Sequence, residues 1–156
     1  MSQFLTGLCY WLHSLATVVF IGHHFLLSWI YLPVMATPDL AAGAILSKIS
    51  ERSRVWMYAS LLTFIITGIY LTVADTNYLR LGNFGNIWGV LMLAKHILVV
   101  GMIVIGFWFN AILRVGPLMT SKTNPTAAIA RFRLYSNLMA FIGLLVLLLT
   151  AFAQVA

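Results

Sequence analysis

The sequence predicts an all-α integral membrane protein, a four-helix bundle whose successive helices run up and down. The chain has 156 residues, of which 62% are hydrophobic and 8% are charged, whereas soluble domains carry about 25% charged residues. It also contains four continuous apolar stretches near the length of roughly 20 residues that crosses a bilayer. Only helices and closed barrels satisfy their backbone in lipid, and runs this long lack the alternation of barrel strands.

The predicted spans cover residues 8–34, 55–74, 87–113 and 134–155, within a single domain of residues 1–156. Between the first two spans, Thr37 can cap a short helix over residues 38–51, in which apolar and charged side chains fall on different faces. Such a helix would lie at the membrane interface, although a solvated connector fits the same residues. The two later loops are rich in turn-forming residues.

Basic side chains in the loops predict the orientation. The first and third loops and the start of the fourth span are basic, the second loop has only Arg80, and both ends of the chain lack lysine and arginine. The positive-inside rule therefore places the first and third loops in the cytoplasm. We expect a bacterial inner (cytoplasmic) membrane, with the N- and C-termini extracytoplasmic. The basic residues behind this expectation are Lys48, Arg52, Arg54, Arg114, Lys122, Arg131 and Arg133.

Composition also narrows the function. The net charge of +6 reflects scarce acidic residues rather than a basic cluster, which argues against nucleic-acid binding. The chain has three acidic residues, with no paired carboxylates, phosphate loop or Ser-His-Asp arrangement. Hydrolytic acid–base chemistry is therefore not expected, and if the protein is an enzyme it is an oxidoreductase. The single Cys9 does not indicate a redox compartment.

All four histidines lie within predicted spans: His13, His23 and His24 in the first and His96 in the third. An ionisable side chain within a membrane is costly and indicates a functional site by default. His13 and His24 are eleven residues apart, about three helical turns, and share a face of the helix, while His23 points to the side. These rings could alternatively hydrogen-bond across helices and bind nothing.

A b-type haem is the favoured interpretation of two of these histidines. The first and third helices of an up-down bundle run parallel, and His13 and His96 lie at similar depth from the helix starts. Imidazole is a common axial ligand of haem iron. Lys95 is the one basic residue deep within a span, and an anionic partner from outside the chain, such as a haem propionate or a quinone-site group, would suit it.

Two other functions remain open. His23 and His24, with Met35, Met92 or Met102 nearby, could bind copper, because imidazole and thioether both suit copper ions. Methionines in an apolar chain are more often packing residues than ligands. An accessory subunit without a cofactor is the third interpretation. In the haem interpretation the partners are the lipid bilayer and either other membrane redox subunits or quinone.

Short motifs resemble the copper-resistance CopD-type membrane domain. They are Leu12-His13, Phe20, Gly22 and Pro33 in the first span, Arg54 and Thr67-Gly68 around the second, and Trp88-Gly89, Leu91, Leu93, Lys95 and Asn110 in the third. The resemblance implies a cytochrome-like bundle and an association with copper uptake. It covers His13 and Lys95, whereas His23, His24 and His96 are not part of that family's pattern.

A weaker likeness links the chain to protoporphyrinogen oxidase of the HemJ type. It rests on Leu12-His13, Tyr31-Leu32-Pro33 and the Trp88-Gly89 pair followed by Lys95. The spacing between His13 and the Tyr-Leu-Pro sequence is longer than in that family.

Overall fold

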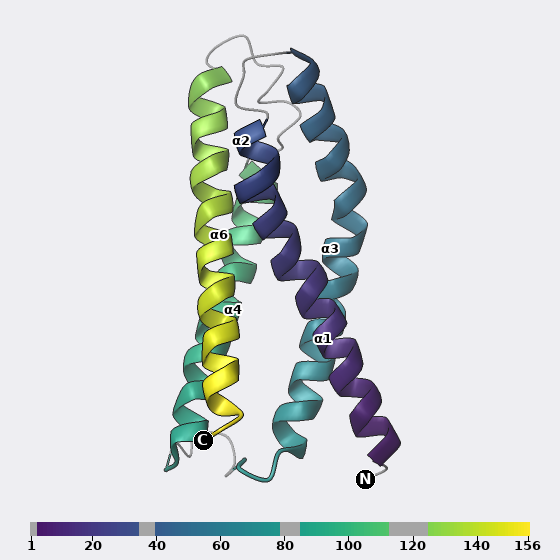
Figure 1. Cartoon of the computed structure of the whole chain (residues 1–156), viewed down its shortest axis with the longest axis vertical. Helices are drawn as coiled ribbons and strands as arrows, with labels where there is room; N and C mark the ends of the chain where they lie inside the picture. The colour runs from purple at the N-terminus through teal and green to yellow at the C-terminus, as the bar shows by residue number, and fades with distance from the viewer. Residues whose placement is uncertain (1–2, 35–39, 79–84, 113–124) are drawn as a thin grey trace.

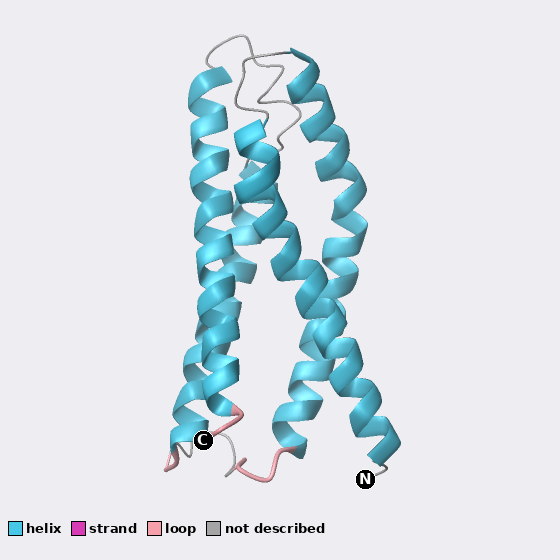
Figure 2. Ribbon diagram, in the orientation of Figure 1, coloured by secondary structure: helices cyan, strands magenta, loops and turns pink. Residues whose placement is uncertain are grey.

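The computed structural model describes residues 3–34, 40–78, 85–112 and 125–156. Four long helical segments form one up-down bundle, with both ends of the chain at the same end of the molecule (Figure 1). All four segments are long and apolar enough to cross a membrane. The predicted fold class, an all-α membrane bundle of four helices, is confirmed. Figure 2 shows helices and short loops throughout the described residues.

The first segment consists of α1 (Gln3–Leu26), η1 (Leu27–Tyr31) and α2 (Leu32–Val34). The η1 segment is a turn of π-helix, in which the N–H of Leu32 donates to the carbonyl oxygen of Leu27, five residues earlier. Pro33 explains this wider turn. Proline has no N–H for a bond four residues back, and its ring would clash with that carbonyl group in an α-helix.

The second segment is α3 (Leu40–Ala74), which runs without a break from the first loop through the second span. The interfacial helix predicted over residues 38–51 is therefore helical from residue 40 but is not a separate element. No glycine or proline stands between residues 44 and 67, so the helix has no reason to end before it enters the membrane. Residues 38 and 39 lie outside the described part of the chain.

The third and fourth segments are α4 (Ile87–Ile112) and α6 (Pro125–Ala153). Asn86 caps α4, because its side-chain oxygen accepts a hydrogen bond from the N–H of Gly89 at 2.8 Å. Proline is favoured in the first turn of a helix, where its missing N–H leaves no bond unmade, and α6 accordingly begins at Pro125. The fourth helix therefore starts nine residues before the predicted span.

The helices pack as two pairs, α1 with α3 and α4 with α6, and contacts between α1 and α6 join the pairs. The main buried cluster lies between α4 and α6 and contains Met102, Tyr135, Met139 and Val146, with Phe20 of α1 against it. Many large apolar side chains on the spans are exposed, as a lipid-facing surface requires. Gly143 of α6 lies against Ile21 of α1, with no room for a Cβ atom.

Candidate functional site

His13 of α1 lies against α3. Its Nδ1 atom is 2.9 Å from the hydroxyl oxygen of Thr67, and its ring stacks on Phe64 with the ring centroids 4.5 Å apart. Gly68 makes room for the ring, since a Cβ atom added there would lie 3.3 Å from Cε1 of His13. Thr67 and Gly68 therefore hold the imidazole in one orientation.

The hydrogen bonds of Thr67 determine which nitrogen of His13 carries the proton. The hydroxyl of Thr67 donates to the carbonyl oxygen of Thr63 at 2.6 Å, and a hydroxyl group has only one hydrogen to donate. In its bond with His13 the hydroxyl must then accept, so Nδ1 of His13 is the donor. A neutral His13 consequently carries its lone pair on Nε2.

His96 of α4 has the same tautomer for a similar reason. Its Nδ1 atom lies 2.6 Å from the carbonyl oxygen of Met92, which can only accept, so the proton is on Nδ1 and the lone pair is on Nε2. His13, Lys95 and His96 lie close enough for the charges of Lys95 and His96 to act on His13. His13 is held against α3, whereas His96 is exposed on α4 and bonds its own helix.

Lys95 is partly buried in α4. The nearest charge of opposite sign acting on it is Asp75, which follows the last residue of α3. No ion pair forms within the described ranges, so Asp75 offsets the charge of Lys95 from a distance without contact. The sequence had favoured a partner from outside the chain.

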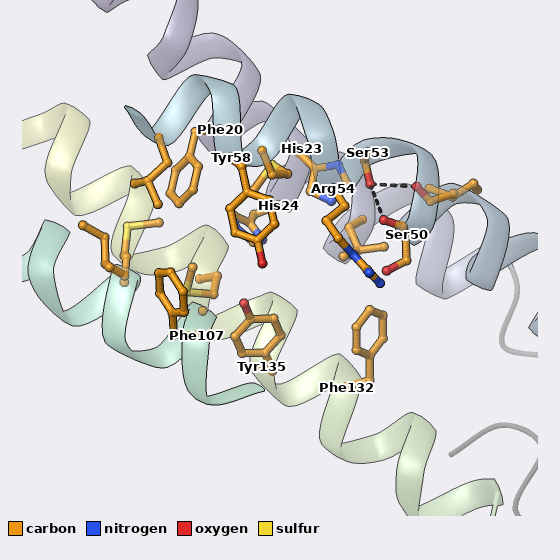
Figure 3. A pocket seen from close by; sticks show the side chains of 18 residues that line it. Phe20, His23, His24, Ser50, Ser53, Arg54, Tyr58, Phe107, Phe132 and Tyr135 are labelled. Carbon is orange, nitrogen blue, oxygen red and sulfur yellow. Dashed lines mark hydrogen bonds between the residues drawn. The ribbon is translucent and has the colours of Figure 1, made fainter. Parts of the chain in front are cut away.

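A second cluster of polar side chains surrounds a cavity of about 100 Å³ between the two helix pairs. Every one of the four long helices contributes to its walls (Figure 3). The lining residues are Phe20, His23, His24 and Leu27 from the first segment, Ile49, Ser50, Ser53, Arg54, Met57, Tyr58 and Leu61 from α3, Met102, Ile103, Gly106 and Phe107 from α4, and Phe132, Tyr135 and Met139 from α6.

His24 is the deepest polar group of this cavity. It is 4% exposed, and neither ring nitrogen has a hydrogen-bond partner among the described residues. Around it lie the rings of Phe20, His23 and Tyr135, with centroids 5.4, 5.6 and 6.2 Å away. A buried polar group without a partner destabilises a fold by about 1–3 kcal/mol. This unmet hydrogen-bonding capacity faces a cavity, which is the arrangement of a binding site.

The other polar side chains of the cavity differ in whether they already make hydrogen bonds within the protein. The hydroxyl of Ser53 donates to the carbonyl oxygens of Ile49 and Ser50 on its own helix, at 2.7 and 3.3 Å. Arg54 is exposed at the α3 side, and Figure 3 shows its guanidinium extending away from α3. No acidic side chain is among the lining residues, so the cavity is electropositive.

Three sequence-based expectations can be compared with this cavity. Phe20, Leu27 and Tyr31 lie near the face shared by His13 and His24 by residue counting, and of these Phe20 and Leu27 line the cavity whereas Tyr31 does not. The expectation that His23 points away from the site of His24 was wrong, because the cavity is broad enough to be lined by both adjacent rings. Of the methionines considered for copper, Met102 lines the cavity, Met92 bonds His96 through its backbone, and Met35 lies outside the described residues.

The contribution of α3 and α6 residues to this cavity was not predicted from the sequence. Arg54, Tyr58 and Leu61 recur at the spacing of one helix face, which could have indicated that they face the same space. Tyr135 offered no comparable signal. Among the described residues there is no group of three or more histidine, cysteine or acidic side chains arranged to hold a metal ion.

The fold and the two polar sites define an integral membrane four-helix bundle with histidines inside it. Scans against family models, curated proteins and solved structures found no match to this chain. The likeness to CopD-type and HemJ-type proteins therefore rests on the short motifs of the sequence alone.

Proposed function

We propose that the protein binds one haem b through His13 and His96 and transfers electrons within the membrane. One observation carries the proposal. Both imidazoles use Nδ1 in a hydrogen bond inside the protein and keep the lone pair on Nε2, and they lie ten residues after the start of α1 and nine after the start of α4. Histidine ligands of metals are oriented in this way, with one nitrogen held by an outer partner and the other free for the metal.

The residues around the two imidazoles suit this cofactor. Thr67 and the carbonyl oxygen of Met92 are the outer partners that orient the two ligands. Lys95 brings a positive charge to the same region, where it can offset the charge of a propionate group. When bound, the haem would supply one-electron redox chemistry, and the chain would supply ligation, orientation and a low dielectric. A small cytochrome, or a subunit of a larger redox complex, fits these properties.

The test is an absorption spectrum of protein purified after expression with ample haem, oxidised and then reduced with dithionite, with a pyridine haemochrome assay. We expect a reduced α-band at the b-type position that disappears in both His13→Ala and His96→Ala. His24→Gln is the matched control, because it alters another intramembrane histidine and should leave the band intact. A colourless protein, or a band that survives in both alanine variants, would overturn the proposal.

Copper handling is the second candidate, and one feature of the cavity favours it. Met57, Met102 and Met139 line the same space as His23 and His24, and thioether and imidazole groups are suitable ligands for copper. Against it stands the positive charge of Arg54. Metal analysis of the purified protein, with His23→Ala and His24→Ala, distinguishes the two candidates. A sample without colour or metal would favour the accessory-subunit interpretation.

A further inference from the structure

We propose that the cavity around His24 binds the ring headgroup of a membrane quinone, with the isoprenoid tail of the quinone in the lipid. The proposal rests on this cavity alone and goes beyond the haem site. Seven residues separate Phe20 of the cavity from His13 on α1, and seven separate Ile103 from His96 on α4. Each interval is about two helical turns, roughly 10 Å, so the two sites are distinct.

The unpartnered nitrogens of His24 match the polar groups of a quinone. A neutral imidazole has one N–H donor and one acceptor nitrogen. The carbonyl oxygen of a quinone can accept from the N–H, and the hydroxyl of the reduced quinol can donate to the other nitrogen. His24 is 4% exposed and faces no other partner among the described residues. A ligand of this kind would satisfy it in either oxidation state.

The walls of the cavity suit a flat apolar ring. Five aromatic side chains line it, and aliphatic and thioether groups make up most of the rest. Small-molecule sites are mostly apolar with a few placed polar groups, as here. A volume of about 100 Å³ has room for several waters and is much larger than a single metal ion requires. The aromatic residues are Phe20, Tyr58, Phe107, Phe132 and Tyr135.

The charge of the cavity lining favours a quinone over a metal cation or a lipid phosphate. Arg54 lines the cavity without any acidic side chain beside it, so a bare metal cation would be repelled. A lipid phosphate would instead be attracted, but the lining has only this one arginine and no lysine. Each of the two carbonyl oxygens of a quinone carries a partial negative charge and needs one hydrogen-bond donor or cation beside it. His24 and Arg54 come from different helices and can serve two such oxygens.

The cavity also has a side through which a tail could leave. Tyr58 of α3 and Phe107 of α4 have ring centroids 6.4 Å apart and are 46% and 57% exposed. These two rings come from different helix pairs, and both line the cavity while being exposed. A headgroup beside these rings could extend its tail between α3 and α4 without crossing the bundle.

The test is a titration of short-chain ubiquinone and menaquinone analogues into the protein in nanodiscs of phosphatidylcholine, followed by tryptophan fluorescence. We expect saturable binding of at least one analogue, with affinity about tenfold lower in His24→Leu and in Arg54→Gln. Val104→Ala is the matched control, because Val104 is a lipid-facing residue, 58% exposed, outside the cavity. The titration is made on samples with and without haem, so loss of haem and loss of quinone binding are scored separately.

An azidoquinone photolabel on the unaltered protein keeps the proposal testable if a variant fails to fold. We expect labelled peptides from residues 20–27, 49–61, 102–107 or 132–139, which line the cavity. Labelling confined to other parts of the chain would overturn the proposal, as would absence of binding by both analogues or equal affinity in His24→Leu. Displacement of the analogue by phosphatidylglycerol in the nanodisc, or stoichiometric Cu(I) that requires His24, would assign the cavity to a lipid phosphate or to copper instead.

Discussion

Gly143→Ala tests the closest contact between α1 and α6. A Cβ atom at this position would lie 2.9 Å from Cγ2 of Ile21 and 3.5 Å from its Cγ1. Carbon atoms in contact prefer a separation of about 3.5–4.0 Å, so the new methyl group would overlap Cγ2 by about 0.6 Å or more. Ile21 is 5% exposed, and its Cγ2 atom is attached directly to Cβ. The side chain therefore has little freedom to move away, and the helices must separate.

The expected loss of stability follows from two opposing effects. Forcing an extra methyl group into a packed interface costs about 1–3 kcal/mol, while replacing glycine with alanine in a helix returns up to about 1 kcal/mol. We therefore expect the free energy of unfolding to fall by about 1–2 kcal/mol. Gly101→Ala is the matched control, because an added Cβ there meets nothing within 4 Å. That variant should be unchanged or slightly more stable.

The measurement is reversible unfolding in mixed micelles of dodecylmaltoside and SDS, followed by circular dichroism. Ile21→Ala removes the atom that the new methyl group would strike, so the double variant should show a favourable coupling between the two positions. Equal stability of Gly143→Ala and the unaltered protein would refute the packing argument. A loss of the same size in Gly101→Ala would show that alanine at any glycine of these helices is harmful, and would refute it as well.

Three further outcomes are expected. Ser28→Ala removes the hydrogen bond that Ser28 donates to the side-chain oxygen of Asn137 on α6. It should lower the free energy of unfolding by about 0.6 kcal/mol, at most about 1.7 kcal/mol. Ser14→Ala, on the exposed face of α1, should leave the free energy of unfolding unchanged. Under the proposed haem ligation, Thr67→Val removes the acceptor for Nδ1 of His13 and should raise the reduction potential of that haem by about 20–60 mV, because His13 becomes a weaker donor to ferric iron. An unchanged potential in a spectroelectrochemical titration would contradict this role. Tags on either terminus should be reached from the extracytoplasmic side of sealed vesicles, and protection of both would reverse the orientation.

The number and type of the helices could be predicted because lipid leaves few options for an apolar run of this length. Their ends could not, because hydropathy reports where the bilayer ends and not where the helix ends. Arg131 and Arg133 made the start of the fourth span look polar, yet α6 begins at Pro125. The same use of hydropathy predicted a boundary between two elements at the charged residues of α3, although a helix continues through Glu51 and Arg54 as readily as through leucine.

The two sites were predictable to different degrees. The similar depth of His13 and His96 along parallel helices could be predicted, because counting residues needs no knowledge of side-chain packing, and their pairing at one haem stays a prediction. The contact of His13 with Thr67 depends on how α1 and α3 are rotated, which a single sequence does not reveal. The cavity around His24 requires side chains from four helices, so its existence depends on the rotations of all four.

The contrast between His13 and His24 is the strongest argument that the buried histidines serve a purpose. His13 has a hydrogen-bond partner in Thr67, a stacking partner in Phe64 and space provided by Gly68. His24 is more deeply buried, with neither nitrogen bonded within the described part of the chain. A leucine there would avoid the loss of about 1–3 kcal/mol that an unsatisfied polar group entails. Violations of this kind in an otherwise consistent fold concentrate at functional sites. His24 also lies three residues before the π-helical turn of the first segment, and such turns are frequent at functional sites. Because Pro33 accounts for that turn, the burial of His24 without a hydrogen-bond partner carries the argument for the cavity.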